Sequence, residues 1–394
     1  MAGNATLRWG STPQQVRNGL LYAFLGGRAH VLPPRNLAEV HQATLHLPYM
    51  KLFLHMEEVY GRGGAEADGA YLPDVDFLLT TDDNLVPMRR VAANDTARLE
   101  RLPAPQFRYG KNNASLDLLF PNFHFGLKRF DSDLLARAPQ LEARHPWAER
   151  KPVAFGRYAS YRRVTAGARE RLGANGTSIC AHGGCGVREH FVQWAARYAP
   201  PKRPTTHQAG AGVKADGDAG RADGTLRGWW IDVSLRGRVA LTAHAAYRYL
   251  VHLDGVALSS RLEQLLTLGS LVVKEESGHY AFFHHLLRPH EHYLPFWQQG
   301  SGPEDIVPML DWAVKHDAEA RRIAHAGQAF AVRYLNAQAR HCYVLWLLQG
   351  YASALRYKPP QPRFAPDLVP LGEYVRKHVL TNEAFARVYN ETDF

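Results

Sequence analysis

Residues 247–274 of this 394-residue chain read YRYLVHLDGVALSSRLEQLLTLGSLVVK, and this stretch decides the fold. Its apolar segment 249–253 has the length of a strand, and the dipeptide Asp254-Gly255 that follows is typical of a turn. The apolar, β-branched segment 271–273 predicts a second strand. With a short helix between them, the two strands form a predicted βαβ-like unit.

Two signals bound the predicted helix. Ser260 and Glu263 have the spacing of a capping box, in which each side chain bonds to the backbone of the other residue. Gly269 stands where a C-cap glycine belongs, because glycine enters the left-handed backbone region without steric cost. Between these signals, three leucines have the spacing of one buried helical face: Leu262, Leu265 and Leu266.

The start of this helix is a candidate anion site. Unpaired N–H groups and the helix dipole concentrate positive partial charge at a helix amino end. Ser259 and Ser260 add hydroxyl donors, and Arg261 adds a guanidinium group whose geometry suits phosphate oxygens. A diphosphate fits such a site. The alternative is that these three side chains only cap a helix on the surface.

The segment 244–295 resembles the core block of glycosyltransferase family 90, which includes the Rumi-type protein O-glucosyltransferases and the fungal capsule-associated glycosyltransferases. The block combines a Tyr-x-Tyr strand, a Ser-x-Arg element, a Gly-Ser pair before an apolar strand, and a His-Tyr-x-Pro element. Several spaced elements in one order are more specific than any single motif. In this chain they are Tyr247, Tyr249, Ser259, Arg261, Gly269, Ser270, His292, Tyr293 and Pro295.

The resemblance implies an α/β fold of the GT-B type, with two Rossmann-like domains facing each other across a cleft. We expect residues 1–150 to form an acceptor-side domain and residues 151–358 a nucleotide-sugar-binding domain. A Gly-, Ala- and Asp-rich surface loop is expected around 200–228, and residues 359–394 form a tail with a short helix. Ligands in open α/β sheets bind beyond the carboxyl ends of the strands.

The same resemblance assigns site residues. The family's catalytic base stands in an Asp-Ile-x-Tyr/Phe-Pro segment, which Asp117 and the residues up to Pro121 match. The donor's diphosphate is expected on Arg261, with Arg188 at the start of another helix and Arg157 assisting. Arg157 stands in Phe-Gly-Arg-Tyr where the family has Phe-Arg-Gly-Ser, a departure from the pattern. The loop before Arg261 completes the expected site: Val256, Ala257, Leu258, Ser259 and Ser260.

The implied activity is an inverting transfer of glucose or xylose from a UDP-sugar to a hydroxyl of a protein or a glycan. The UDP-sugar is the donor substrate, and no cofactor or metal is expected, because arginine and the helix end take over the electrostatic task of a metal. Four histidines near one another (His284, His285, His290 and His292) lack the HExxH or cysteine pattern of a zinc site. An inactive nucleotide- or glycan-binding relative is the alternative.

Composition narrows the partners. A formal net charge of +10 favours anionic ligands. The basic residues are scattered, which argues against a nucleic-acid-binding protein. No apolar run reaches the ~18 residues of a membrane helix, and no signal peptide is evident. Five Asn-x-Ser/Thr sequons favour the lumen of the endoplasmic reticulum or Golgi, or secretion: Asn4, Asn94, Asn113, Asn175 and Asn390.

Two further segments give local expectations. Residues 1 to about 60 are expected to be mostly helical. Residues 72–79, LPDVDFLL, predict a buried strand whose acidic residues, Asp74 and Asp76, face solvent. The three cysteines, Cys180, Cys185 and Cys342, are too few for a disulfide framework, although a Cys180–Cys185 bridge and free thiols are both compatible with the sequence.

Overall fold

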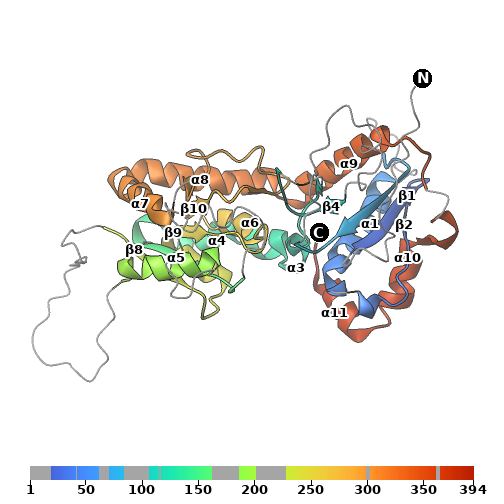
Figure 1. Cartoon of the computed structure of the whole chain (residues 1–394), viewed down its shortest axis with the longest axis horizontal. Helices are drawn as coiled ribbons and strands as arrows, with labels where there is room; N and C mark the ends of the chain where they lie inside the picture. The colour runs from blue at the N-terminus through green and yellow to red at the C-terminus, as the bar shows by residue number, and fades with distance from the viewer. Residues whose placement is uncertain are drawn as a thin grey trace, which may run out of the picture. The chain divides into compact units, whose positions relative to one another are not determined.

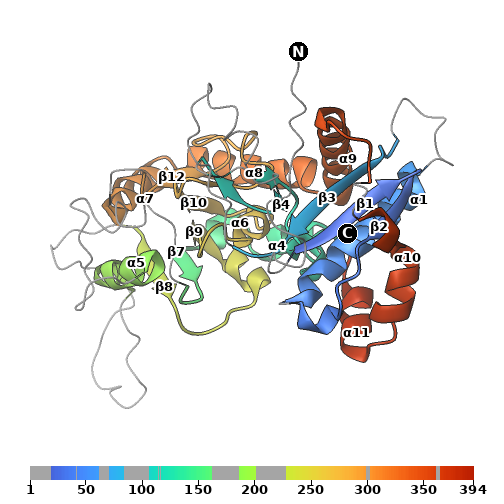
Figure 2. The same ribbon diagram turned by 45° about the vertical axis from the view of Figure 1, so that its right-hand side comes forward.

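A computed structural model describes residues 19–40, 42–61, 71–83, 106–113, 115, 117–161, 186–200, 228–298, 302–360 and 364–394 (Figures 1 and 2). The chain divides into two compact units. Unit 1 comprises residues 1–136, 279–284 and 333–394, and unit 2 comprises residues 137–278 and 285–332. The Cys180–Cys185 segment and most of the expected 200–228 loop lie outside the described residues.

Unit 2 contains a five-stranded sheet in which every pair is parallel. Its order is β12 (Leu294–Phe296), β10 (Leu271–Glu275), β9 (Tyr247–His252), β7 (Lys151–Arg157) and β8 (Trp230–Ser234). Helix α6 (Arg261–Leu266) connects β9 to β10. The predicted βαβ unit and the α/β class are therefore confirmed.

One face of this sheet forms the core of unit 2. Tyr249 and Val251 of β9 and Leu271 and Val273 of β10 belong to one buried cluster, as expected from the two-residue repeat of a strand. The cluster includes residues of α5 (Val187–Ala195), α7 (Ile306–Lys315) and α8 (Asp317–Tyr334). Helix α5 lies beside β8 in both views (Figures 1 and 2). Helix α4 (Ala138–Arg144) opens unit 2.

Unit 1 contains a six-stranded mixed sheet. Its order is β13 (Val369–Pro370), β2 (Arg28–Val31), β1 (Gly19–Leu25), β3 (Val75–Thr80), β4 (Phe107–Arg108) and β6 (Leu118–Leu119). The first four strands pair antiparallel, and β3, β4 and β6 pair parallel. A separate antiparallel pair joins β5 (Lys111–Asn112) to β11 (His279–Tyr280).

The α-helices described in unit 1 come from the beginning, the middle and the end of the chain. They are α1 (Leu47–Tyr60), α3 (His124–Leu127), α9 (Ala337–Ala354), α10 (Leu371–Tyr374) and α11 (Glu383–Glu391). The blue helix α1 and the red helices α10 and α11 lie side by side (Figure 1). The unit boundaries thus differ from the expected 1–150, 151–358 and 359–394, because the carboxyl-terminal segment adds β13 to β2 and packs on the first helix.

Two local expectations for unit 1 are wrong. Residues 19–25 and 28–31, expected to be helical, form the antiparallel strands β1 and β2. Asp76, expected to face solvent, is fully buried and accepts a hydrogen bond from the Tyr357 hydroxyl, because β3 is covered on both faces. Asp74 accepts a hydrogen bond from the Gly26 N–H at 2.7 Å.

Candidate functional site

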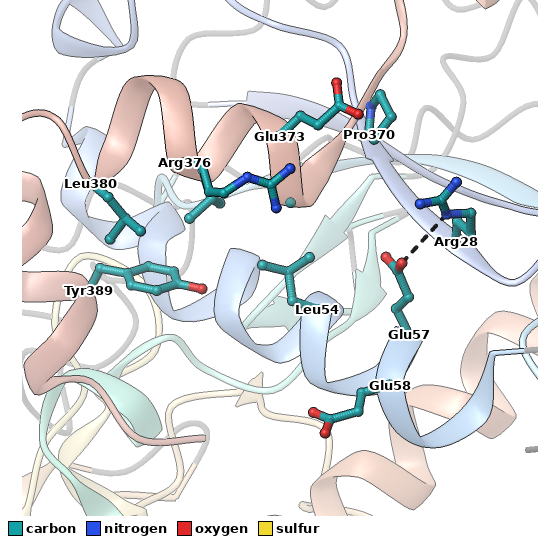
Figure 3. Close-up of a pocket in the computed structure, with 11 residues that line it drawn as sticks. Arg28, Leu54, Glu57, Glu58, Pro370, Glu373, Arg376, Leu380 and Tyr389 are labelled. Atoms are coloured by element: carbon teal, nitrogen blue, oxygen red, sulfur yellow. Dashed lines mark ion pairs between the residues drawn. The ribbon is translucent and has the colours of Figure 1, made fainter. Parts of the chain in front are cut away.

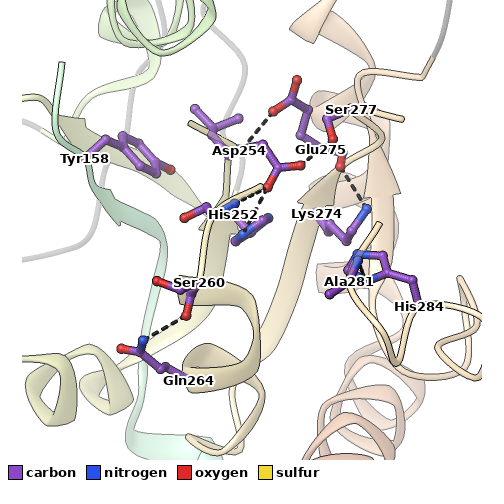
Figure 4. Close-up of polar contacts among 12 residues, drawn as sticks. Tyr158, His252, Asp254, Ser260, Gln264, Lys274, Glu275, Ser277, Ala281 and His284 are labelled. Atoms are coloured by element: carbon purple, nitrogen blue, oxygen red, sulfur yellow. Dashed lines mark hydrogen bonds and ion pairs between the residues drawn. The ribbon is translucent and has the colours of Figure 1, made fainter. Parts of the chain in front are cut away.

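The loop that follows β9 is held by the buried carboxylate of Asp254. Its Oδ1 accepts a hydrogen bond from the Ser259 N–H at 2.8 Å, and its Oδ2 accepts one from the Ser277 hydroxyl. The Asp254 N–H donates to Glu275 Oε2 at 3.1 Å. Figure 4 shows Asp254, Glu275 and Ser277 at the carboxyl ends of β9 and β10. These hydrogen bonds fix the path of the loop after β9. The loop lies at the carboxyl end of the parallel strands, which is where open α/β sheets bind their ligands.

The start of α6 differs from the predicted capping box. Ser260 occupies the N-cap position, but its side chain makes no capping hydrogen bond. Its carbonyl accepts from the Gln264 side chain at 2.8 Å, and Glu263 is buried. Asp254 instead holds the residue just before the N-cap, because its carboxylate accepts from the Ser259 N–H. Gly269 has the predicted left-handed conformation, with φ of 65°.

The loop residues 256–260 differ in how far they are exposed to solvent. Ala257 and Leu258 are buried, whereas Val256, Ser259 and Ser260 are partly exposed. Asp254 holds this run of expected donor-site residues through the Ser259 N–H. Only the two serines among them offer side-chain hydroxyls.

Arg261 carries a buried polar atom without a partner. Its Nη1 makes no hydrogen bond to any described residue. Burial lowers the pKa of this guanidinium, and the nearby Tyr158 acts in the opposite direction. A buried cationic donor without an acceptor costs free energy, so this position favours an anionic ligand.

Arg188 donates to backbone carbonyls. Its Nε donates to the main-chain carbonyl of Asp254 at 3.0 Å and its Nη2 to that of Leu253 at 3.0 Å. Its Nη1 donates to the main-chain carbonyl of Ala159 at 3.1 Å. The side chain therefore ties the loop after β7 to the loop after β9. Arg188 opens α5, as expected, and within unit 2 it fixes the two loops that border the candidate site.

Arg157 is held by an ion pair with Asp232, with an Nη2–Oδ1 distance of 2.9 Å, and lies 4.2 Å from the centre of the Phe155 ring. The departure from the family pattern has a steric reason. A Cβ at Gly156 would lie 2.1 Å from the hydroxyl oxygen of Tyr158, whose side chain folds back and donates to the Val251 carbonyl at 2.9 Å. The position of the Tyr158 side chain therefore requires glycine at 156.

Asp117, the expected base, is in unit 1 and is completely buried. Its Oδ1 accepts from Arg108 Nε at 2.9 Å, and its Oδ2 accepts from the Ser115 hydroxyl. Arg108 also pairs with Asp82, which follows β3. The parallel strands β3, β4 and β6 bring these three charges together.

Asp254 and Arg108 are structural supports that sequence reasoning missed. Asp254 was interpreted only as a turn residue, because its partner Ser277 lies 23 positions away in the sequence. Arg108 carried a signal, since a basic residue between two aromatic residues in a short strand needs a buried acidic partner. The identity of that partner depends on the pairing of β4 with β6.

The four histidines near one another in the sequence do not form a metal site in the described part of the chain. Among them, no group of three or more His, Cys, Asp or Glu side chains is arranged to hold a metal ion. The Nδ1 atom of His284 accepts from the Ala281 N–H, and that of His292 from the Arg288 N–H, each at 2.9 Å. Among all the residues that the structure describes, no helix has the length and apolar character needed to cross a bilayer.

Unit 1 also contains a cavity of about 430 Å³ between α1 and the carboxyl-terminal helices (Figure 3). Its walls carry charges of both signs, including Glu57, Arg28 and Arg376. The Arg28 and Glu57 side chains approach to 3.8 Å. None of its described lining residues has a buried polar atom without a partner, so the cavity indicates no particular ligand.

Comparisons with known proteins identify related chains. Protein O-glucosyltransferase 2 of Danio rerio is 38% identical over 123 residues, which are 31% of this chain and 24% of the relative. O-glucosyltransferase rumi of Drosophila melanogaster is 24% identical over 301 residues, which are 73% of this chain and 62% of the relative. The match to the Danio protein thus spans about a quarter of that protein's length.

Among solved structures, Anabaena Alr3699/HepE in complex with UDP and glucose aligns with a TM-score of 0.34 and 11% identity over 64% of each chain. The same protein in complex with UDP-glucose aligns with a TM-score of 0.33 and 12% identity, over 67% of this chain and 69% of that one. A TM-score below 0.5 does not establish a shared fold, so the α/β assignment rests on the sheets described above.

The family model described as glycosyl transferase family 90 matches residues 68–174 and 234–377, which are more than half of the chain. The matched ranges include Asp117, the loop after β9, and Arg261. The chain belongs to glycosyl transferase family 90.

Proposed function

We propose that this protein is a glycosyltransferase that moves a sugar, glucose or xylose, from a UDP-sugar to a hydroxyl of a protein or glycan. The observation that carries the proposal is the buried, unpartnered Nη1 of Arg261 in the family's core block. The names of the Danio and Drosophila relatives, both O-glucosyltransferases, favour glucose.

The donor's diphosphate would accept hydrogen bonds from Arg261 and from the Ser259 and Ser260 hydroxyls. Charge accumulates on the leaving diphosphate as the bond to the anomeric carbon breaks, and a fixed guanidinium stabilises that charge. Arg188 would position the loop and not bind the diphosphate itself, because its donors already bind the carbonyls of Leu253 and Asp254. The proposed site requires no metal, since the cation of Arg261 supplies the compensating charge.

Asp117 is the proposed base of an inverting transfer. The acceptor hydroxyl gives its proton to the carboxylate while its oxygen forms the new bond to the anomeric carbon, and UDP leaves with the electron pair of the broken bond. Arg108 holds one carboxylate oxygen, and the Ser115 hydroxyl occupies the other. The acceptor would displace Ser115 from that oxygen.

A panel of UDP-sugars tests the function. The purified chain is incubated with UDP-glucose, UDP-xylose and UDP-galactose, with and without EDTA, and UDP release and thermal stabilisation are measured. We expect stabilisation by UDP and release from UDP-glucose or UDP-xylose that EDTA does not abolish. A folded chain that neither binds UDP nor hydrolyses any of these donors would contradict the proposal.

An inactive nucleotide-binding relative is the second candidate. It is favoured by the engagement of Arg157 with Asp232 and of both Asp117 oxygens with neighbouring side chains. This candidate predicts UDP binding without turnover for any donor and acceptor.

We also propose that the protein acts in the secretory pathway. Two of the five sequon asparagines, Asn113 and Asn390, lie on the surface of unit 1, as glycosylation requires. Asn4, Asn94 and Asn175 lie outside the described residues. Expression in a eukaryotic cell with a leader sequence, followed by glycosidase treatment, tests whether these sites carry glycans.

A further inference from the structure

His244 carries one of several buried side-chain atoms of unit 2 that have no hydrogen-bond partner among the described residues. It belongs to the short 3-10 helix Leu241–Ala246, which leads directly into β9, and only 3% of its surface is exposed. Its Nε2 has no hydrogen-bond partner among the described residues. A buried polar atom of this kind is uncommon and costs free energy unless a ligand satisfies it.

The other ring nitrogen fixes which chemistry Nε2 offers. Nδ1 lies 3.1 Å from the Ala240 carbonyl oxygen, and a carbonyl oxygen only accepts, so the proton of the neutral ring is on Nδ1. Burial lowers the pKa of His244 to about 4, so the ring is neutral at pH 7. Nε2 therefore carries a lone pair and acts as an acceptor.

The surroundings of His244 connect it to the candidate donor site. The cationic groups of Arg261 and Arg157 are close enough to lower its pKa further. The ring meets Phe155 edge to face at 4.9 Å, and Phe155 stacks on Tyr247 at 3.9 Å. Unit 2 therefore has two unpartnered groups near each other. One is an acceptor, Nε2 of His244, and the other is a cationic donor, Nη1 of Arg261.

A nucleoside diphosphate complements this pair of atoms. Its phosphates suit the guanidinium, and its nucleoside carries hydroxyl or imide hydrogens that an acceptor can bind. We propose that His244 Nε2 accepts a hydrogen bond from the nucleoside part of the donor, either a ribose hydroxyl or the N3–H of uracil, and so selects the nucleotide. This inference rests on the proposed function.

The experiment measures the affinity of the full chain for UDP, 2′-deoxy-UDP, 3′-deoxy-UDP and CDP, whose N3 carries no hydrogen. A site with a buried acceptor discriminates strongly against a ligand that lacks the matching donor. We expect one of the three analogues to bind the wild-type chain about tenfold or more weakly than UDP. His244→Phe keeps an aromatic ring but removes the acceptor, so this variant should bind that analogue and UDP equally.

His244→Gln keeps an acceptor oxygen and should retain part of the discrimination, which a merely structural role would not predict. His190→Phe alters another buried histidine of unit 2 and should leave the ratio of affinities unchanged. If wild type binds UDP and neither His244 variant changes any ratio, the inference about His244 is wrong and the proposed function stands. If folded wild type does not bind UDP, both are wrong.

Discussion

Arg108 Nε donates to Asp117 Oδ1 at 2.9 Å, and the side chains of both residues are almost completely removed from solvent. The same guanidinium pairs with Asp82, so two carboxylates depend on one cation. The two buried side chains therefore depend on each other for stability, whether or not Asp117 acts as a base.

Loss of Arg108 should therefore be costly. Arg108→Met leaves Asp82 and Asp117 without their cation in a buried site, and we expect the free energy of unfolding to fall by about 3–5 kcal/mol. Urea denaturation measures this change. Arg129→Met is the matched control, because Arg129 forms an exposed pair with Asp133 at 3.5 Å and should cost less than about 1 kcal/mol. Equal losses in the two variants would contradict the prediction.

Asp117→Asn tests the proposed base. The amide has almost the same shape but accepts no proton, so turnover should fall by about 100-fold or more, while UDP affinity changes little. Initial rates and UDP titration separate the two effects. The inactive-relative candidate instead predicts no turnover to lose, and unchanged turnover in the variant would exclude Asp117 as the base.

Arg261→Ala tests the proposed diphosphate contact. Removal of a charge-assisted hydrogen bond should weaken UDP binding by about 2 kcal/mol, or roughly 30-fold in Kd. Calorimetric titration measures the change. Arg321→Ala, at an exposed position of α8, serves as the control and should bind UDP like wild type. If Arg261→Ala binds UDP normally, this side chain is not part of the site.

Gly156→Ala tests the steric relation to Tyr158. The added Cβ would displace the tyrosine ring and its hydrogen bond to Val251, at a cost of about 1–3 kcal/mol in unfolding free energy. The control is Gly350→Ala in α9, where a Cβ meets no atom within 4 Å and helix propensity should add about 0.5–1 kcal/mol. Opposite signs for the two alanine variants are expected, and two similar changes would refute the steric explanation.

Acid should destabilise the protein through its buried histidines. Burial lowers the pKa to about 4 for five of them: His124, His190, His244, His252 and His341. In the unfolded chain a histidine titrates near 6.5, so unfolding takes up protons below that pH. Stability is therefore complete above pH 6.5 and falls as the pH drops toward 4, by up to about 1.4 kcal/mol per pH unit for each histidine.

His252→Phe isolates one of these contributions. His252 is almost fully buried, with Nε2 at 3.9 Å from Asp254 Oδ1. Between pH 6.5 and 5, the free energy of unfolding should fall less steeply with decreasing pH in the variant than in wild type. The difference in slope should correspond to the uptake of about one proton on unfolding. Urea denaturation at several pH values gives both slopes, and identical slopes would show that His252 does not contribute.

The sequence by itself determined the βαβ unit around residues 247–274 and the family. Strand, turn, helix and C-cap glycine are set by neighbouring residues, so local patterns predict them, as at Gly269. The run Gly19–Leu25 shows the limit of this method. It forms a strand paired with β2 on one side and β3 on the other, and a strand buried on both faces lacks the alternation that would distinguish it from a helix.

Only the tertiary structure decided how the polar side chains are used. Arg188 and Arg157 are basic residues of the expected type, but each is held by groups far away in the sequence, the Leu253 and Asp254 carbonyls and the Asp232 carboxylate. Asp254 likewise holds the Ser259 N–H and the Ser277 hydroxyl, which lie five and 23 positions further along the chain. Backbone preferences act over a few residues, whereas a buried charge is satisfied by whichever partner the sheet pairing brings within hydrogen-bonding distance.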